Sequence, residues 1–545
     1  MIETRPGRRE KLTLLACCAA ASLAAIAWSW THRAMLNYGD AVAHLHIARR
    51  VFDSRYPGYS QLGSVWLPLP HVLMIPLVAV YGWWANGIAG LIPSALAWLA
   101  SCYGLYRLAR HWLRPAPAAV ALAFFVLNPN LLYMQTTAMT EPLFVCEMVW
   151  TALWLVEWRA SLDKAGLGDE RRTRRLTWLL ALVLVAAVYT RYDGWIMTLL
   201  AWSGMGVALL RRGRLGSKTF WLASAVVVAA PLAWFGYNQF VFGDWLDFVR
   251  GPYSAKAIEL RTALPGGPPH PGWHDMWMSF LFFVKTAELD AAAEQWGGLL
   301  LAVSAVGVAW ALLTSRKKAF PWSLLLWLPA PFYAYSVAYG SVPIFLPVWW
   351  PHSFYNTRYG LELLPALALS VGFAASFALA AVREWNPRWV RAAAMVMFAL
   401  VGANLGLMLK HRALVYVEGT KNIDARRAYE VDIPAAMRSL LASRPGAPVL
   451  MVTSVYPDIV AFTGIPLRQT INEGDQEMWQ QALQAPAEHA GVVLAFAGDD
   501  VDRAVHAHPE GLTEVRRFIA PTQPAGTLYV SDTWGRGEAT SKPER

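Results

Sequence analysis

The sequence predicts a polytopic α-helical membrane protein with about eleven transmembrane helices and a small C-terminal α/β domain. Of its 545 residues, 56% are hydrophobic and only 15% are charged, and the mean hydropathy is +0.33. Soluble domains carry about 25% charged residues, which disfavours a soluble multidomain enzyme. Apolar runs of roughly 20 residues, long enough to cross a bilayer, recur along the first three quarters of the chain. The last quarter alternates short apolar stretches with polar ones, which is typical of a small α/β domain.

Eleven apolar runs are expected to span the membrane. The first follows Arg8, Arg9 and Lys11, so a cleaved signal peptide is its alternative, although the length of the run favours a retained helix. A further apolar piece near 70–85 is short and interrupted by prolines, and we expect an interfacial or re-entrant segment there. The expected spans are residues 12–31, 86–107, 115–130, 139–157, 176–190, 194–210, 219–241, 296–314, 320–340, 359–382 and 391–409.

Basic residues mark one side of the predicted membrane. With a cytoplasmic N-terminus, six cytoplasmic segments of about 60 positions hold 23 of the 47 Lys and Arg residues, with clusters at 171–175, 211–214 and 316–318. This is the positive-inside pattern, and an odd number of spans places the C-terminal domain in the periplasm or outside the cell. The net charge of +10 then belongs to a basic cytoplasmic face. We therefore expect a multi-pass protein of the cell (inner) membrane and no nucleic-acid partner.

The predicted organisation is a transmembrane domain over residues 1–410 and an extracytoplasmic α/β domain over residues 411–545. The first domain has external loops at about 32–70, 242–295 and 341–358, and its segment 261–274 is rich in Pro and Gly, which suggests a lid-like loop. The second domain offers strands at 449–453, 492–496, 515–519 and 528–530 and helices at 476–489 and 499–507. The four cysteines lie in apolar runs and suggest neither a disulfide framework nor a zinc site; they are Cys17, Cys18, Cys102 and Cys146.

The first external loop carries a carboxylate close to the membrane, where charges are usually paired or functional. From Asp40 onward the loop has helical spacing, which sets Asp40 and His44 on one face of a helix. Asp40 is then a candidate general base or cation ligand, with His44 as co-ligand or orienting partner. The alternative is that Asp40 only caps the helix, and spacing alone does not separate the two interpretations.

Two later external turns are also unusually polar. The turn over 128–144 contains Glu141 directly before a proline, which suits the start of a helix. Helix capping does not explain its many other hydrogen-bonding side chains, so a polar pocket lining is the second interpretation. The next turn holds Arg191 and Asp193 between two short spans, where a purely structural ion pair is the alternative to a role in a shared site.

A further external stretch contains Arg358 and Glu362, four residues apart. A local salt bridge is one interpretation, and the other is that the paired donors of the guanidinium grip an anion. All of these motifs fall on the external side of a topology that the basic residues define independently. This convergence predicts an active or binding site at the outer membrane interface, with Asp40, Glu141, Arg191 and Arg358 around one outward cavity.

Several familiar motifs are absent from the sequence. It contains no Walker sequence, no Gly-rich dinucleotide fingerprint, no His-Glu-x-x-His and no Gly-x-Ser-x-Gly. ATP-driven transport and zinc-dependent proteolysis therefore lose support. The pairs Asp244/Asp247 and His270/His274 have metal-compatible spacing but lack the rest of a ligand set, and we assign no metal ligands.

Taken together, the polar motifs resemble those of the GT-C superfamily of integral-membrane glycosyltransferases. The likeness is to the branch that includes protein O-mannosyltransferases and the lipid A aminoarabinose transferase. It covers roughly residues 12–410 and rests on the order and sidedness of four features. They are Asp40 after the first span, the stretch from Asn128-Pro129 to Thr140-Glu141-Pro142, the turn Thr190-Arg191-Tyr192-Asp193-Gly194-Trp195, and Asn356-Thr357-Arg358-Tyr359 before a Pro-containing span.

This resemblance implies a hexosyl- or pentosyltransferase that takes a sugar from a polyprenyl-phosphate donor on the external face, in one inverting displacement. It implies that Asp40 deprotonates or orients the acceptor hydroxyl, and that Arg358 and Arg191 stabilise the charge growing on the lipid phosphate. Positioning of the substrates is then expected of the other polar site residues, Glu141, Asp193, His44, Tyr192 and Tyr359. Members that use a metal often have a second acid after the first; here Ala41 follows Asp40, so a divalent cation is kept only as an optional cofactor.

Two other classes stay open at this point. A transporter or flippase of lipid-linked sugars would carry polar residues near mid-span and two related halves; Glu147 and Glu362 are the main in-span acids, and no halves repeat. A polysaccharide polymerase or ligase would share the donor but usually lacks the first-loop acid and a polar C-terminal domain. The sequence does not determine the sugar, or whether the acceptor is a lipid, a glycan or a protein.

Overall fold

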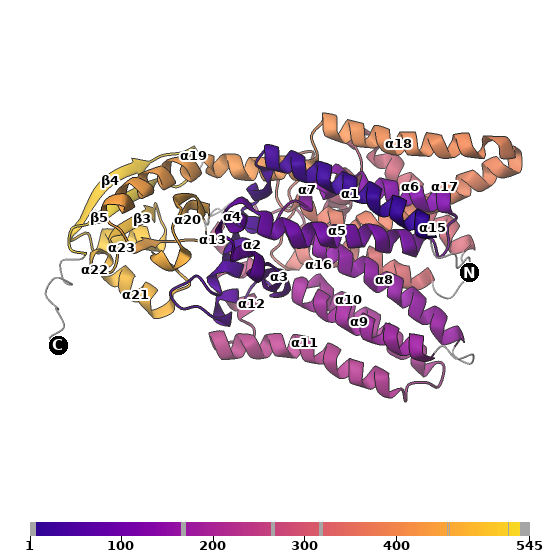
Figure 1. The fold of residues 1–545 in the computed structure, drawn as a ribbon, viewed down its shortest axis with the longest axis horizontal. Coiled ribbons are helices and arrows are strands. Elements are labelled where there is room, and N and C mark those ends of the chain that lie inside the picture. Colours follow the sequence, from indigo (N-terminus) through magenta and orange to yellow (C-terminus); the bar gives the residue numbers. More distant parts are fainter. Residues whose placement is uncertain are drawn as a thin grey trace. The chain divides into compact units, whose positions relative to one another are not determined.

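The computed structural model describes residues 7–164, 170–262, 268–314, 320–454, 456, 458–521 and 523–534. Within this part the chain is mostly helical and has one five-stranded sheet near its C-terminal end (Figure 1). The predicted combination of many apolar helices with a small C-terminal sheet is confirmed. The basic cluster at 316–318 and the middle of the expected lid-like loop, 263–267, lie outside the described residues.

The chain forms two compact units, which are described one at a time. Unit 1 comprises Met1–His32, Ser64–Pro70 and Ile92–Glu418, and unit 2 comprises Arg33–Gly63, His71–Leu91 and Gly419–Arg545. Residues 33–63, expected as a loop of the transmembrane domain, are thus part of the same compact unit as the C-terminal sheet. Three helices run across the limits of the units, namely α3 (Leu69–Val78), α5 (Ile88–Ala109) and α19 (Leu414–Ser443).

Unit 1 is built almost entirely from helices. Besides its shares of α3, α5 and α19 it contains α1 (Arg8–Thr31), α6 (Pro115–Val126), α7 (Pro129–Met134), α8 (Glu141–Lys164), α9 (Glu170–Thr190), α10 (Asp193–Leu210), α11 (Lys218–Phe242), α12 (Asp247–Arg250), α13 (Ala255–Thr262), α14 (Met276–Ala291), η3 (Glu294–Trp296), α15 (Gly297–Thr314), η4 (Phe320–Trp327), α16 (Pro329–Tyr339), η5 (Thr357–Leu363), α17 (Leu364–Trp385), η6 (Pro387–Trp389) and α18 (Val390–Lys410).

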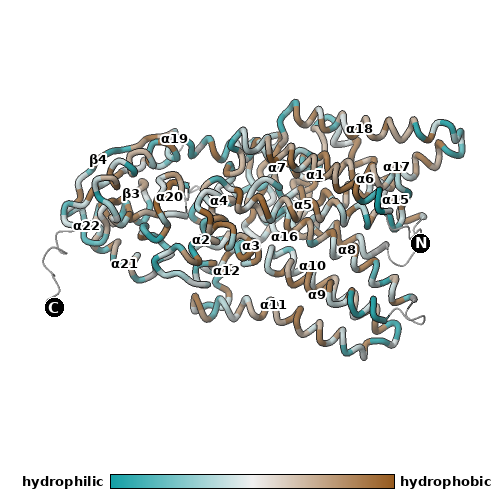
Figure 2. The backbone as a smooth tube through the Cα atoms, viewed as in Figure 1, coloured by the Kyte–Doolittle hydropathy of each residue, from teal (hydrophilic) through white to brown (hydrophobic). Residues whose placement is uncertain are grey.

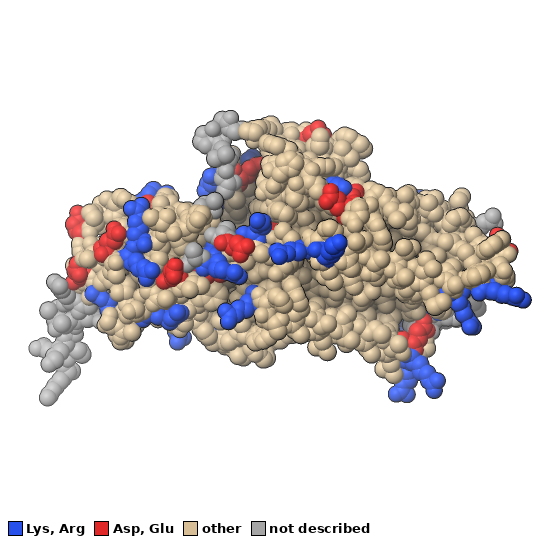
Figure 3. Space-filling model, turned by 90° about the horizontal axis from the view of Figure 1, so that it is seen from above, with Lys and Arg blue, Asp and Glu red and all other residues tan. Residues whose placement is uncertain are grey.

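Eight helical segments of the described part are long and apolar enough to cross a membrane. Figure 2 shows hydrophobic residues recurring along α1, α11 and α18, with hydrophilic residues at turns such as that between α17 and α18. Figure 3 shows broad areas of surface without charged side chains, as lipid-facing helices require. The eight segments are Arg8–Thr31, Ile88–Ala109, Glu170–Thr190, Asp193–Leu210, Lys218–Phe242, Glu294–Thr314, Thr357–Trp385 and one within Pro387–Ser443. The count of eleven spans stays a prediction.

Two expected spans are not single long helices, because in each of them a proline, Pro329 or Pro129, starts a new helix within the apolar run. The run 320–340 is divided into η4 and α16, because the ring of Pro329 fits the first turn of a helix but not its interior. The run 115–130 ends as α6 at Val126, and the side chain of Asn128 then caps the short helix α7 by accepting from the main-chain nitrogen of Leu131 at 2.9 Å. Conversely, the segment 242–295 was expected to be a loop but contains the 16-residue helix α14.

Unit 2 contains a mixed sheet of five strands in the order β2-β1-β3-β5-β4. The strands β1 (Val449–Met451), β2 (Thr470–Ile471) and β3 (Val492–Phe496) are parallel, and β5 (Gly526–Ser531) pairs antiparallel with both β3 and β4 (Leu512–Phe518). The four predicted strands are confirmed, and β2 is an additional one. The intervening helices are α20 (Asp458–Thr463), η7 (Leu467–Gln469), α21 (Gln476–Gln484), α22 (Pro486–His489) and α23 (Asp500–Ala507).

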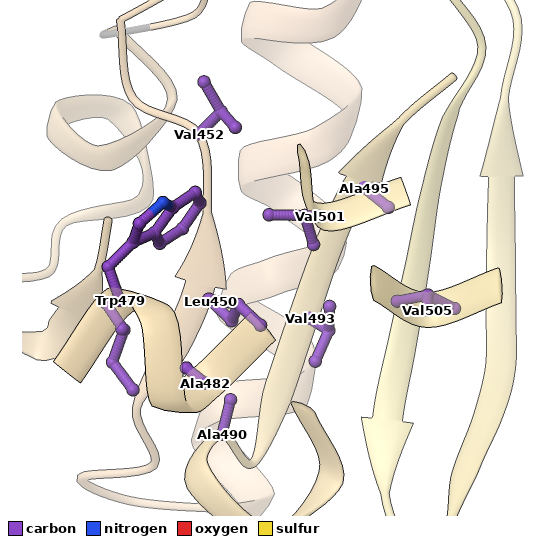
Figure 4. Close-up of a cluster of buried hydrophobic side chains, with 10 residues drawn as sticks. Leu450, Val452, Trp479, Ala482, Ala490, Val493, Ala495, Val501 and Val505 are labelled. Atoms are coloured by element: carbon purple, nitrogen blue, oxygen red, sulfur yellow. The ribbon is translucent and has the colours of Figure 1, made fainter. Parts of the chain in front are cut away.

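One face of this sheet buries an apolar cluster (Figure 4). Leu450 of β1 and Val493 of β3 are fully buried, and Trp479 of α21 and Val501 of α23 cover them from the helical layer. Burial of an aliphatic or aromatic side chain of this size contributes roughly 1.5–3 kcal/mol, so the cluster anchors the helices to the sheet.

The segments of unit 2 that come from the N-terminal part of the chain are η1 (Ala34–Leu36), α2 (Gly39–Arg50), η2 (Tyr59–Leu62) and α4 (Tyr81–Asn86). Main-chain oxygens of the C-terminal part hold them in place. Arg55 donates through Nε to the oxygen of Thr470 at 2.8 Å, and the Tyr81 hydroxyl donates to that of Ala461 at 2.9 Å. The unit is therefore one packed body made from two distant parts of the chain.

Candidate active site

Unit 1 holds a cluster of buried ionic side chains around Arg191. Its Nη1 donates to the hydroxyl of Thr140 at 2.9 Å and lies 3.4 Å from Oε1 of Glu141. Its Nη2 donates to the hydroxyl of Tyr333 at 2.6 Å and lies 3.1 Å from Oε1 of Glu362. Burial by itself lowers the pKa of the Arg191 guanidinium, but the surrounding carboxylates, Glu362 first among them, raise it well above its ordinary value. Arg191 is therefore a permanent positive charge at this site.

The turn that carries Arg191 is tight because a glycine follows it. Only Arg191 and the next residue separate α9 from α10. A Cβ atom on Gly194 would lie 2.2 Å from the main-chain oxygen of Ala187, so only glycine allows the two helices to approach this closely. Asp193, the first residue of α10, accepts from Nε of Arg191 at 3.4 Å. Local packing thus points the guanidinium toward α8, α16 and η5.

Arg358 belongs to the same cluster from another part of the chain. Its Nε donates to Oε1 of Glu141 at 3.0 Å, and its Nη1 lies 3.5 Å from Oε1 of Glu418. The Glu418 carboxylate also accepts from the main-chain nitrogens of Asn356 at 2.8 Å and Thr357 at 3.0 Å. Asn356 has φ of 56°, a left-handed conformation that asparagine tolerates better than most residues. Glu418 therefore fixes the turn that presents Arg358.

Aromatic rings lie against both guanidiniums. The ring of Tyr359 stacks on that of Tyr333 with centroids 4.8 Å apart, and Tyr333 stacks in turn on Phe283 at 4.9 Å. The Cζ atoms of Arg191 and Arg358 lie 5.2 and 5.1 Å from the centroid of Tyr359. Such contacts are favourable where water is excluded. They hold the two arginines in fixed orientations.

Glu141 bridges the two arginines through a single oxygen. Its Oε1 is shared by Arg191 and Arg358, whereas its Oε2 is buried without a hydrogen-bond partner among the described residues. A buried acceptor without a donor costs free energy, so this oxygen would gain from a hydrogen-bond donor. The residues thus combine fixed cations with a carboxylate oxygen that lacks a donor.

Asp290 of α14 is a further buried carboxyl beside this cluster. Neither of its side-chain oxygens has a hydrogen-bond partner in the described part of the chain, and Gly360 leaves room for it, since a Cβ there would lie 2.5 Å from Oδ2. Burial, and then the charge of Glu418, raise the pKa of Asp290 well above its ordinary range. The side chains of Asn128 and Asn130 donate to its main-chain oxygen at 2.7 and 3.0 Å, which holds α14 in place.

The predicted site residue Tyr192 and the in-span acid Glu147 have different surroundings. The hydroxyl of Tyr192 donates to the main-chain oxygen of Val65 at 2.8 Å, and its ring stacks on Phe248 with centroids 5.3 Å apart. Glu147, on α8, accepts from the hydroxyl of Thr190 at 2.7 Å. The described contacts of Tyr192 therefore serve the packing of unit 1.

Asp40 and His44 lie on α2 in unit 2. The N-cap residue of α2 is Tyr38, so Asp40 is the second residue of the helix rather than its cap. Nδ1 of His44 lies 2.8 Å from Nε2 of His71, and both rings are buried. One ring must donate this proton and the other must accept it, which favours a pair that carries no more than one positive charge.

The structure therefore brings together Glu141, Arg191, Asp193, Arg358 and Tyr359 from the predicted set. The predicted local salt bridge between Arg358 and Glu362 is wrong. Arg358 pairs with Glu141 and Glu418, while Glu362 pairs with Arg191. Sequence reasoning missed Tyr333, Glu418 and Asp290. Glu418 and Asp290 are acids within ten positions of a predicted span end, but many other acids of the chain share that feature, so it does not distinguish them.

The sequence assigns no metal ligands. Among the described residues, no group of three or more His, Cys, Asp or Glu side chains lies where it could hold one ion. In the two pairs with metal-compatible spacing, Asp244/Asp247 and His270/His274, one residue of each contacts another side chain. His270 lies 3.3 Å from Glu259, and Asp244 lies 3.7 Å from Arg250.

Comparison with known proteins adds a likeness of fold. The crystal structure of ArnT from Cupriavidus metallidurans bound to undecaprenyl phosphate matches with a TM-score of 0.54 and 13% identity, over 95% of this chain and 97% of that chain. The apo state of ArnT gives a TM-score of 0.49 at 14% identity, over 92% and 94% of the two chains. An Archaeoglobus fulgidus oligosaccharyltransferase in complex with Zn and sulfate gives a TM-score of 0.46 at 11% identity, over 94% of this chain and 72% of that chain. No protein-family model and no curated protein sequence matches the chain.

The match to undecaprenyl-phosphate-bound ArnT extends over nearly the whole of both chains, so this chain shares the fold of that protein. Together with the long apolar helices, this likeness indicates a polytopic membrane protein, and the resemblance inferred from the sequence motifs is confirmed at the level of the fold.

Proposed function

We propose that this protein is a glycosyltransferase that moves a sugar from a polyprenyl-phosphate donor to an acceptor on the external face of the membrane. The observation that carries the proposal is the pair of arginines joined by Glu141, of which Arg358 is buried and Arg191 is 15% exposed. Arg191 and Arg358 come from separate turns and are held by carboxylates and by the ring of Tyr359. The bound undecaprenyl phosphate of ArnT, the protein with the matching fold, supports a polyprenyl-phosphate donor.

The two guanidiniums have the chemistry that departure of a lipid phosphate requires. Negative charge grows on the phosphate as the anomeric bond breaks, and fixed cations in a water-poor site stabilise that charge without having to reorient. We assign this role to Arg358 and to Arg191. Entry of the phosphate requires the arginines to exchange carboxylate contacts for phosphate contacts, since Glu141 and Glu362 already bind them.

A buried carboxylate oxygen without a donor, such as Oε2 of Glu141, suits a hydroxyl group of a substrate. We assign Glu141, and with it Asp193, to positioning the sugar or the acceptor. His44, Tyr192 and Tyr359 complete the proposed positioning residues. Asp40 is proposed as the base that deprotonates or orients the acceptor hydroxyl, a role that rests on the resemblance of the sequence motifs and that substitution tests directly. No step of this scheme is assigned to a metal ion.

The topology completes the proposal. The positive-inside pattern favours a cytoplasmic N-terminus in the cell (inner) membrane and a C-terminal domain in the periplasm or outside the cell. The acceptor is a lipid, a glycan or a protein, and the enzyme class is a hexosyl- or pentosyltransferase.

Substitution of Asp40 by Asn tests the proposed base. Transfer of sugar from a polyprenyl-phosphate donor is measured in membranes, and we expect a fall on the order of 10²–10⁴-fold, the contribution of general base catalysis. Asp424→Asn is a matched control in the same unit, because the Asp424 side chain is 54% exposed and should leave transfer unchanged. Full activity of a folded Asp40→Asn protein would remove Asp40 as the base.

Substitution of Arg358 by Lys tests the phosphate site and separates a transferase from a transporter. Lysine keeps the charge but loses the paired donors, so the KM for the donor should rise on the order of tenfold. A new glycosidic product must appear in a transferase, whereas a flippase moves the lipid-linked sugar unchanged. Movement of the donor across vesicles without any transferred sugar would overturn the proposal.

A further inference from the structure

The helix that carries Asp40 is bound at its start by the C-terminal part of unit 2. The main-chain nitrogen of Gly39 donates to Oδ1 of Asn422 on α19 at 3.3 Å. One turn further along α19, Nη2 of Arg426 donates to the main-chain oxygens of residues 36 and 37, at 3.5 and 3.4 Å. These three contacts hold the turn directly before Asp40.

The other end of α2 is bound by the C-terminal part as well. Arg49 donates to the carboxylate of Asp53 at 2.7 Å, and this carboxylate accepts from the main-chain nitrogens of residues 467 and 468 at 3.4 and 3.5 Å. Arg55 reaches the main-chain oxygen of Thr470 on β2. The direction of α2 is therefore set by contacts at both ends, all within unit 2.

Arg426 is itself held in place from its other side. Its guanidinium is 3.5 Å from Glu430, on the same helix, and 3.5 Å from Asp458 on α20, with only 9% of the side chain exposed. A Cβ atom on Gly39 would lie 2.7 Å from Nη1 of Arg426, so the glycine is what allows the guanidinium to come against the turn. A buried charge of this kind is costly, and the Asp458 carboxylate, the Glu430 carboxyl group and two carbonyl oxygens offset the cost.

We propose that Arg426 is a positioning residue for Asp40, and that setting the start of α2 is a function of the C-terminal domain. The C-terminal helix α19 thereby determines where the Asp40 carboxylate stands. The catalytic consequence rests on the proposed function, whereas the positioning of α2 is a property of unit 2 alone.

Hydrogen–deuterium exchange of the full-length protein in detergent tests the positioning. In Arg426→Lys, which keeps a charge for Asp458, and in Gly39→Ala, which crowds the guanidinium, we expect amides over 39–44 to exchange on the order of tenfold faster. Amides of β3 should stay protected, which shows that the sheet is folded. Arg427→Ala is the matched control, because the neighbouring Arg427 is 67% exposed, and it should exchange like the wild type. Unchanged exchange at 39–44 in both variants would overturn the positioning.

Kinetics with a polyprenyl-phosphate sugar test the catalytic consequence. Displacing a base by about 1 Å costs up to about 100-fold, so kcat should fall on the order of 10- to 100-fold in Arg426→Lys, with the donor KM within about threefold. Because Arg426 acts through Asp40, the double variant with Asp40→Asn should be no slower than Asp40→Asn alone. An additive loss would overturn the link to Asp40. A wild-type protein that transfers no sugar would refute the proposed function, and the exchange measurement would still decide the positioning of α2.

Discussion

Replacing Glu141 by Gln tests whether this residue is the ionic link between Arg191 and Arg358. Glu141 is fully buried, and its Oε1 lies 3.0 Å from Nε of Arg358 and 3.4 Å from Nη1 of Arg191. Removing one partner of a buried ion pair costs about 3–5 kcal/mol, because the other charge is left without compensation. Arg358 keeps the carboxylate of Glu418 at 3.5 Å, and Arg191 keeps those of Glu362 at 3.1 Å and Asp193 at 3.4 Å, so we take the lower end, about 3 kcal/mol.

The assay is thermal unfolding of the purified protein in detergent, followed by tryptophan fluorescence. At about 2 °C per kcal/mol, the scale of large domains, Glu141→Gln should lower the Tm by about 6 °C. Glu147→Gln is the matched control on the same helix. The carboxylate of Glu147 accepts from the hydroxyl of Thr190, and a glutamine oxygen can accept from it too, so a change below about 1 kcal/mol is expected. Equal unfolding temperatures for the two variants would refute the bridging role of Glu141.

Three further predictions concern packing and pH. Gly194→Ala should prevent correct packing of α10 on α9, seen as loss of folded protein in size-exclusion chromatography, whereas Gly206→Ala, whose Cβ would meet its neighbours at 3.5 Å, should fold normally. Leu450→Ala should destabilise the buried cluster by about 2–5 kcal/mol, measured as faster hydrogen exchange in β3, and Val515→Ala, on an exposed side chain, should not. Burial raises the pKa of Asp499 from 3.8 to about 6, so the folded state holds this proton more tightly than the unfolded state and stability falls as pH rises from about 4 to 6. Thermal unfolding of Asp499→Asn should show a smaller fall over that range, and an unchanged pH profile would contradict the assignment.

Much of the fold could be predicted from the sequence, because the signals that specify it are local. A helix that faces lipid must be apolar over about 20 residues, so runs such as 219–241 coincide closely with observed helices. Short apolar stretches bounded by turn residues likewise indicated the strands at 449–453 and 492–496. Prolines made two spans harder to predict, since Pro329 starts a helix within a continuous apolar run.

The candidate site could be predicted only in part. Arg191, Asp193, Glu141 and Arg358 stood out because charges at turns between apolar runs are rare and costly. Their partners could not be read in the same way, since ion pairing depends on which helix ends meet in space. Tyr333 has no local feature that marks it as the hydroxyl that donates to Glu362 and accepts from Arg191.

The sequence by itself determined that this protein crosses a membrane many times, carries a C-terminal α/β fold and gathers polar residues at a few turns. Hydropathy and periodicity are properties of neighbouring residues, so they can be read from the sequence without any knowledge of the tertiary structure. Only the tertiary structure decided that Arg358 pairs with Glu141, 217 positions away, rather than with Glu362, four positions away. It also placed α2 with the C-terminal sheet in one unit. Those pairings follow from long-range packing, which selects one partner among several of suitable charge.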